Sequence, residues 1–263
     1  MKAKNVFFIA VIAIMLTSCM TTNYFQVYKA VPSDKIIMKD SSLVYEDENC
    51  KVFYNLWDVE GGNIGFKFYN KTEKNIYLNM EESFFILNGI ANNYYKNRVY
   101  TNSSSTGTST THKTKEAKSN SVSNLSVQGY SVANNEEKTV CIPSFTSKII
   151  TEYTINKTLY RDCDLFIYPN SKEVKTKTFT KSNSPFVFSN KIVYFVGQSE
   201  NSIEFENEFY VKEITNYPKS DMIDKKFIDY CGQESMEKSE YFLNISSDKF
   251  YIEYNKDSPY WEH

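Results

Sequence analysis

Short runs in which apolar and polar residues alternate cover most of this chain and predict strands rather than helices. Between Ile64 and Tyr69, for example, every second side chain is apolar on one face, which is the period of a half-buried strand. Runs of the same kind lie at 42–45, 50–57, 76–78, 83–87, 139–142, 148–155, 165–168, 175–180, 186–188, 191–196 and 203–214. Short strands with turn signals every ~8–12 residues are typical of a β-sandwich.

The turns between these runs have recognisable residues. Gly61-Gly62 can reach positive φ without steric cost, and Asn88-Gly89 is a strong signal for a two-residue hairpin. The last long run changes its apolar phase, which predicts a bulge or a turn near Asn207.

Three segments depart from the alternating pattern. Residues from about 101 to 126 are rich in Ser and Thr with almost no apolar side chain, so we expect a mobile polar loop. Between Ser220 and Cys231, a capping serine, early acidic residues and the glycine that follows predict a short helix. The runs 241–244 and 250–254 predict a terminal hairpin. The predicted fold is mainly β, an immunoglobulin-like antiparallel β-sandwich with a long polar loop and a short C-terminal helix plus hairpin.

The N-terminal residues have the pattern of a bacterial lipoprotein. Two lysines precede an apolar run that ends at Met15, as in secretory signals. The string Leu16-Thr17-Ser18-Cys19 follows and fits the lipobox pattern, in which the cysteine thiol takes a diacylglycerol and the chain is cut before it. We therefore predict a signal peptide at 1–18 and lipidation of Cys19. The alternative is an ordinary cleavage site with an incidental cysteine.

Lipidation determines the expected domain plan. Residues 19–35 are expected to be the lipidated cysteine and a tether, 36–217 the sandwich, and 218–263 the C-terminal extension. Two or more acyl chains hold a protein stably on a membrane, and no later apolar run approaches the ~20 residues of a spanning helix. Met20, in place of an acidic residue, favours the outer membrane with the domain facing the periplasm.

Charge and aromatic content narrow the classes of partner. The chain has 30 Lys and Arg against 32 Asp and Glu, a net charge of −2, with both signs interspersed. This argues against a nucleic-acid partner, because such a surface needs a clustered basic excess. The 21 Tyr and 19 Phe fit strands filled by aromatic residues, with a ligand-binding use of tyrosines as the alternative.

Four cysteines follow Cys19, namely Cys50, Cys141, Cys163 and Cys231. An exported protein can form disulfides, and the pair Cys141 and Cys163 flanks a short strand-like stretch. If any pair is bridged, we expect it to be this one. The cysteine spacings match no metal signature.

Catalytic motifs are scarce. The two histidines lie in the polar segment and at the last position, and no GxSxG, HExxH or phosphate-binding glycine loop is present. Glu204, Glu206 and Glu208 alternate along a predicted strand, where they would form its solvated face. We predict no catalytic residue, no cofactor and no metal site; the alternatives are a hydrolase that uses carboxylates alone and calcium at Asp162 and Asp164.

One long stretch carries a family resemblance. The sequence LVYEDENCKVFYNLWDVEGGNIGFKFYNKTEKNIYLNMEESFFILNG, with CIPSFTSKII and SPFVFSNKIVYFV further on, resembles uncharacterised Bacteroides-type outer-membrane lipoproteins. Their pattern is similar to immunoglobulin-like or late-embryogenesis-abundant-like sandwiches. The resemblance implies a fold, and it transfers no functional residue.

The expected function follows from the anchor and the missing catalytic set. We expect a non-enzymatic interaction or structural module of the cell envelope, with the membrane and an envelope protein as partners. The alternative is a glycan-binding protein, because aromatic rings can stack on sugars. Its candidate contact residues are Trp57, Tyr94, Tyr95 and Trp261.

Overall fold

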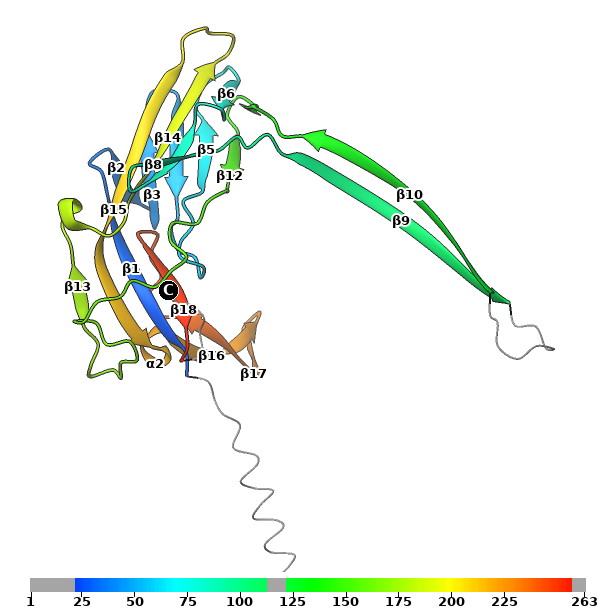
Figure 1. The fold of residues 1–263 in the computed structure, drawn as a ribbon. Helices are drawn as coiled ribbons and strands as arrows, with labels where there is room; N and C mark the ends of the chain where they lie inside the picture. Colours follow the sequence, from blue (N-terminus) through cyan, green and yellow to red (C-terminus); the bar gives the residue numbers. More distant parts are fainter. Residues whose placement is uncertain (1–21, 113–121, 257–263) are drawn as a thin grey trace, which may run out of the picture.

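The computed structural model describes residues 22–112 and 122–256, and these ranges form a sandwich of antiparallel β-sheets (Figure 1). The predicted mainly β fold is confirmed. The larger sheet has the order β11-β6-β14-β15-β1-β18; its strands are β1 (Tyr24–Pro32), β6 (Ile76–Asn79), β11 (Thr139–Ile142), β14 (Val187–Val196), β15 (Ile203–Pro218) and β18 (Lys249–Tyr254), joined at the sides by β7 (Phe84–Leu87), β8 (Ile90–Asn93) and β13 (Thr176–Thr178). The smaller sheet has the order β12-β5-β4-β3-β2; its strands are β2 (Ile36–Lys39), β3 (Ser42–Glu46), β4 (Cys50–Tyr54), β5 (Phe66–Asn70) and β12 (Ser147–Ile150). A 3-10 helix, η1 (Lys181–Asn183), precedes β14.

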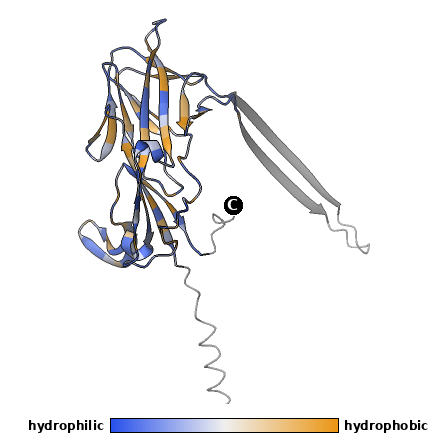
Figure 2. Ribbon diagram, turned by 60° about the vertical axis from the view of Figure 1, so that its left-hand side comes forward, coloured by the Kyte–Doolittle hydropathy of each residue, from blue (hydrophilic) through white to orange (hydrophobic). Residues whose placement is uncertain are grey.

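The main core is built by residues that alternate along the strands. In β4 and β5, Val52, Tyr54, Phe66 and Phe68 are buried and the residues between them are more exposed. Figure 2 shows apolar and polar residues alternating along the strands of the sandwich. From the facing sheet, the ring of Phe209 lies 5.3 Å from that of Tyr54, a spacing at which aromatic pairs add to the stabilisation from buried area.

The predicted turns are confirmed at both glycine positions. Gly61 and Gly62 have φ values of 90° and 86°. Asn88 and Gly89 also have positive φ and join the hairpin strands β7 and β8.

The predicted bulge lies at a different place in β15. Lys29 of β1 pairs with Glu213 and Ala30 pairs with Val211, so Lys212 is the extra residue. Asn207, where we predicted the irregularity, is fully buried and in phase with its apolar neighbours. The phase of the apolar residues changes between Val211 and Ile214, at the bulge itself, and the polar Asn207 at a core position led us to place the change too early.

The segment predicted as a tether is largely a central strand, so the boundary at residue 36 was wrong. β1 pairs with β15 on one side and with β18 on the other. Phe25 and Tyr28 point to opposite faces of this strand and both have no exposed surface. Burial on both faces removes the alternation by which half-buried strands are recognised.

The polar segment predicted as a mobile loop is described as two paired strands. β9 (Val99–His112) and β10 (Val122–Asn135) form an antiparallel ribbon with continuous register. Figure 1 shows the ribbon extending away from the sandwich. Its Thr and Val residues suit strands, and the pairing provides hydrogen-bond partners for the backbone of the ribbon. The prediction of an irregular loop was therefore wrong.

The C-terminal region also differs from expectation. The helix α2 (Lys219–Met222) has one turn, and the chain continues as β16 (Ile223–Tyr230), which pairs with β17 (Gln233–Phe242). The predicted helix to Cys231 and the predicted hairpin of 241–244 with 250–254 were therefore wrong. Ile223 and Phe227 lie four residues apart, a spacing that fits one face of a helix and one face of a strand equally well.

Candidate functional site

A loop from Thr158 to Tyr168 lies against β1 and β15 of the larger sheet and is held there by polar side chains. Gln26 of β1 donates from Nε2 to the Tyr160 carbonyl at 2.9 Å, and its Oε1 accepts from the Tyr160 amide at 2.6 Å. Asn216 of β15 pairs with Gln26 and donates to the Phe166 carbonyl at 2.9 Å. Hydrogen bonds from these buried side chains fix the backbone of the loop.

The loop was predicted as a strand at 165–168, and it forms no ladder. Tyr254 of β18 donates from its hydroxyl to the Ile167 carbonyl at 2.5 Å. The Tyr28 hydroxyl donates to the Oε1 of Gln26, so β1 supplies a connected pair of side chains beneath the loop. The loop backbone therefore forms its hydrogen bonds with side chains of the sheet, where a strand would form them with the backbone of a neighbouring strand.

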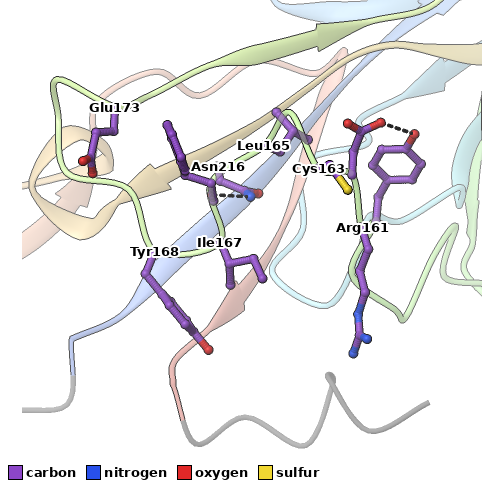
Figure 3. A pocket seen from close by; sticks show the side chains of 10 residues that line it. Arg161, Cys163, Leu165, Ile167, Tyr168, Glu173 and Asn216 are labelled. Carbon is purple, nitrogen blue, oxygen red and sulfur yellow. Dashed lines mark hydrogen bonds between the residues drawn. The ribbon is translucent and has the colours of Figure 1, made fainter.

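A pocket of about 580 Å³ lies against this loop (Figure 3). Leu165, Phe166, Ile167 and Tyr168 form its apolar wall, and its other lining residues are Tyr160, Arg161, Asp162, Cys163, Glu173 and Asn216. Volumes of this size accommodate small ligands. In Figure 3 the side chains of Arg161, Ile167 and Tyr168 extend toward the same side.

Charged side chains at the polar end of the pocket pair with one another. Lys177 lies 2.6 Å from the carboxylate of Asp164 and 3.2 Å from that of Asp162. The Asp162 carboxylate also accepts from the Asp164 amide at 2.8 Å and from the Tyr160 hydroxyl at 3.2 Å. The Asp164 amide and Lys177 lower the pKa of Asp162. The Asp162 carboxylate, held in its anionic form by Lys177, therefore stabilises the turn at residues 162–164 and is not set up to donate a proton.

The loop exposes three consecutive apolar residues, Phe166, Ile167 and Tyr168, which we call the loop patch. Their exposed fractions are 48%, 42% and 36%, whereas Leu165 just before them is buried. The ammonium of Lys175 lies 4.8 Å from the Phe166 ring centroid, and that of Lys256 lies 5.4 Å from the Tyr168 ring centroid. The loop patch thus consists of aromatic and aliphatic side chains with two lysines, Lys175 and Lys256, beside its rings.

A second cluster of charges joins the polar ribbon to the sandwich. Arg98, just before β9, donates to both oxygens of Glu152 at 2.9 and 3.0 Å, and its Nε donates to Glu136 at 3.0 Å. The other oxygen of Glu136 accepts from the amides of Lys96 and Arg98. Fork-shaped guanidinium pairing is geometrically specific. This ribbon clamp, formed by Arg98, Glu136 and Glu152, fixes the base of the ribbon.

Because of the ribbon clamp, we expect the free energy of unfolding to fall in acid. Burial raises the pKa of Glu136, but hydrogen bonds from Arg98 and from two amides outweigh it and lower the pKa from 4.5 to about 2. Because the folded pKa is below the unfolded one, the stabilisation is complete above pH ~4.5 and is lost as the pH falls toward ~2. Glu136→Gln is expected to flatten this decline and to cost about 2 kcal/mol at neutral pH.

Urea unfolding at a series of pH values measures this effect. Glu81→Gln is the matched control, because Glu81 pairs with Lys138 in an exposed salt bridge, and such pairs contribute less than about 1 kcal/mol. Equal pH profiles for the two variants would contradict the role of Glu136.

Three of the four predicted aromatic contact residues lie in the described part of the chain, where their surroundings differ. Tyr94 is 2% exposed and donates its hydroxyl to Asn190 at 2.7 Å in the core, so its prediction as a contact residue was wrong. Trp57 is half-buried against Phe242 and Tyr251, with ring centroids 5.3 and 4.9 Å away. Tyr95 is half-buried with Lys138 over its ring at 5.4 Å. Cys19 and Trp261 lie outside the described residues.

The expected disulfide is absent. Cys141 and Cys163 are both free and exposed, as is Cys231, while the free thiol of Cys50 is buried. Cys141 lies on β11, at one edge of the larger sheet, and Cys163 lies in the loop beside β1. The stretch between them is not a simple hairpin, because the chain passes from β12 in the smaller sheet to the loop that lies against β1 and β15 of the larger sheet.

Sequence reasoning missed the polar side chains that position the loop. The sequence contains no local signal for Gln26 and Asn216, since they are single amides 190 residues apart that meet only through the pairing of β1 with β15. Within residues 22–112 and 122–256, no three His, Cys, Asp or Glu side chains are grouped so that they could hold a metal ion. In the same ranges no helix has the length and apolar character needed to cross a membrane. Comparisons with protein-family models, curated proteins and solved structures find no match for this chain.

Proposed function

We propose that this chain is a lipid-anchored protein of the bacterial cell envelope whose β-sandwich is a non-enzymatic interaction or structural module. The observation that carries the proposal is the string Leu16-Thr17-Ser18-Cys19 directly behind a short apolar run with a basic front. Acyl chains on Cys19 would hold the domain on a membrane without a spanning helix. Met20 after the cysteine favours the outer membrane, with the domain in the periplasm.

The position of β1 supports an anchor close to the domain. Tyr24 begins β1, five residues after Cys19. Five extended residues span at most about 18 Å. The domain would therefore sit near the membrane surface rather than at the end of a long tether.

The state of the carboxylates supports a non-enzymatic role. A carboxylate-only glycosidase needs one acid whose pKa is raised. Hydrogen bonds and ion pairs lower the pKa of Glu136, Glu152 and Asp162 against the effect of burial. Glu204 and Glu208 form ion pairs with Lys191 and Lys181 on the outer side of β15. All five of these carboxylates are thus engaged in contacts within the fold.

Cys19→Ser tests the proposed anchor in cells. We expect the unsubstituted protein to pellet with the membranes and to resist extraction by salt and by carbonate. Cys19→Ser is expected to abolish this association, since a serine cannot take the thioether-linked lipid. Cys163→Ser is the matched control, because it removes an exposed thiol and is expected to leave the protein in the membrane fraction. Membrane association of Cys19→Ser equal to that of the control would contradict the anchor.

Cross-linking in intact cells tests the interaction role. We expect the anchored protein to recover one or more envelope proteins that the Cys19→Ser variant recovers far less. Recovery of no protein would contradict the interaction role, and recovery of envelope glycan alone would favour the glycan-binding alternative.

A further inference from the structure

The loop patch lies at the end of the domain where β1 begins. The ring of Tyr168 is 5.2 Å from that of Tyr24, the first residue of β1. The helix α2 is at the same end, since the Lys219 amide donates to the Asn23 carbonyl at 3.2 Å. Figure 1 shows the start of β1, α2 and the end of β18 together at the lower end of the sandwich.

This inference rests on the proposed anchor at Cys19, which places the same end next to a membrane. At most about 18 Å of chain separates the Cα atoms of Cys19 and Tyr24. The far end of β1, at Pro32, is roughly 26 Å further away along the strand. Because the acyl chains lie in the bilayer, the end of the domain that contains Tyr24 must face the membrane surface.

We propose that the loop patch is a membrane-contact surface that inserts into the headgroup layer beside the lipid anchor. Tyr and other aromatic residues with an apolar body and a polar tip favour the membrane–water interface. Phe166 and Ile167 add apolar surface, and Lys175 and Lys256 place ammonium groups beside the rings, where they can meet lipid phosphates. The occupant is therefore a phospholipid surface that contains anionic headgroups.

The loop is built to present these side chains outward. Asn216 and Tyr254 hold the carbonyls of Phe166 and Ile167 from the sheet side. Leu165 and Pro169 at the two ends of the loop patch are buried. These backbone contacts fix the loop, and the side chains of the loop patch stay exposed at the mouth of the pocket that they line.

Fluorescence quenching by brominated phospholipids tests the proposal. Trp57 and Trp261 are replaced by Phe, and a reporter is introduced by Ile167→Trp or by Ile90→Trp. Ile90 is the matched control, because it is 69% exposed and lies in the β7–β8 hairpin, which pairs through β14 and β15 to the far end of β1. The lipidated proteins are reconstituted into vesicles of phosphatidylethanolamine and phosphatidylglycerol with brominated acyl chains.

We expect several-fold greater quenching of the Ile167→Trp reporter than of the Ile90→Trp reporter. Groups that insert into the interface lie ~5–10 Å deep, at the boundary between the headgroups and the acyl chains. Equal, weak quenching of both reporters in protein that floats with the vesicles would overturn the membrane contact and leave the anchor intact. Failure of the lipid-processed protein to float would overturn the anchor and the contact together.

Hydroxyl-radical footprinting of the protein without substitutions gives a second measurement that depends on no variant. We expect protection of Phe166 and Tyr168 in vesicles relative to unlipidated protein in solution, with no change at Ile90. Protection of the loop patch only in cell envelopes, and not in pure lipid vesicles, would assign the surface to a protein partner and overturn the proposal.

Discussion

Gly61→Ala is expected to lower the free energy of unfolding by about 4 kcal/mol or more, which places it among the most damaging single substitutions. Gly61 has φ of 90°, and a Cβ there would lie 1.4 Å from the carbonyl oxygen of Asn156. That contact is sterically impossible, so the backbone must move. The movement would disturb the hydrogen bonds of Gly61 with Tyr251 and with Asn156, both 3.0 Å long.

Gly89→Ala separates the two causes of this loss. Gly89 also has positive φ, at 80°, but a Cβ there has no atom within 4 Å. Its cost should therefore be the backbone strain alone, about 1–2 kcal/mol. Urea unfolding of both variants, followed by circular dichroism, measures the difference. Equal costs would show that the close approach of Gly61 and Asn156 does not exist in solution.

Removing residues 22–32 is expected to prevent folding, because these residues include β1. Tyr24, Phe25, Val27 and Tyr28 are at most 8% exposed, and burial of each such side chain contributes about 2 kcal/mol. Together they are comparable with the ~5–15 kcal/mol by which a typical domain is stable. The deletion would also separate β15 from β18, which pair with opposite edges of β1.

Removal of the ribbon is the matched deletion. Residues 101–133 are replaced by Asn-Gly, which joins the paired positions Tyr100 and Asn134 through a favoured hairpin turn. We expect this protein to fold with a cooperative unfolding transition, whereas the chain without residues 22–32 shows none. Cooperative folding of the chain that lacks residues 22–32 would contradict the central position of β1.

Strands with alternating or dense apolar residues were predictable from the sequence. The apolar residues of β5 alternate, β14 contains the dense apolar run 191–196, and Asn88-Gly89 marks the β7–β8 turn. These strands and this turn depend on residues that are neighbours in the sequence, so the local sequence pattern is enough to predict them. Elements that depend on distant partners were not predictable in this way.

β1 and β16 illustrate the limit. β1 pairs with β18 across most of the length of the chain, and its residues show no simple alternation because both faces are covered. In β16, the spacing of Ile223 and Phe227 was compatible with a helix until pairing with β17 decided between the two. In β16 the tertiary contacts overrode a local helical preference, whereas the residues of β1 favour a strand and only its alternation was hidden.

The candidate site depends on register in the same manner. Gln26 and Asn216 are directly opposite in the β1–β15 pair, and together they hold the loop that carries the loop patch. Neither position is informative alone, because a single amide in a strand is compatible with many contacts. The anchor motif at Cys19, by contrast, is a contiguous string and needs no fold to be recognised.

The mass of the mature N-terminal peptide tests the lipid anchor most directly. The protein is extracted from bacterial membranes with detergent and digested, and the N-terminal peptide is analysed by mass spectrometry. We expect a peptide that begins at Cys19 and carries a diacylglycerol on its thiol, with or without a third acyl chain on its amine. A mature peptide that begins elsewhere, or one that begins at Cys19 with a free thiol, would contradict the lipid anchor.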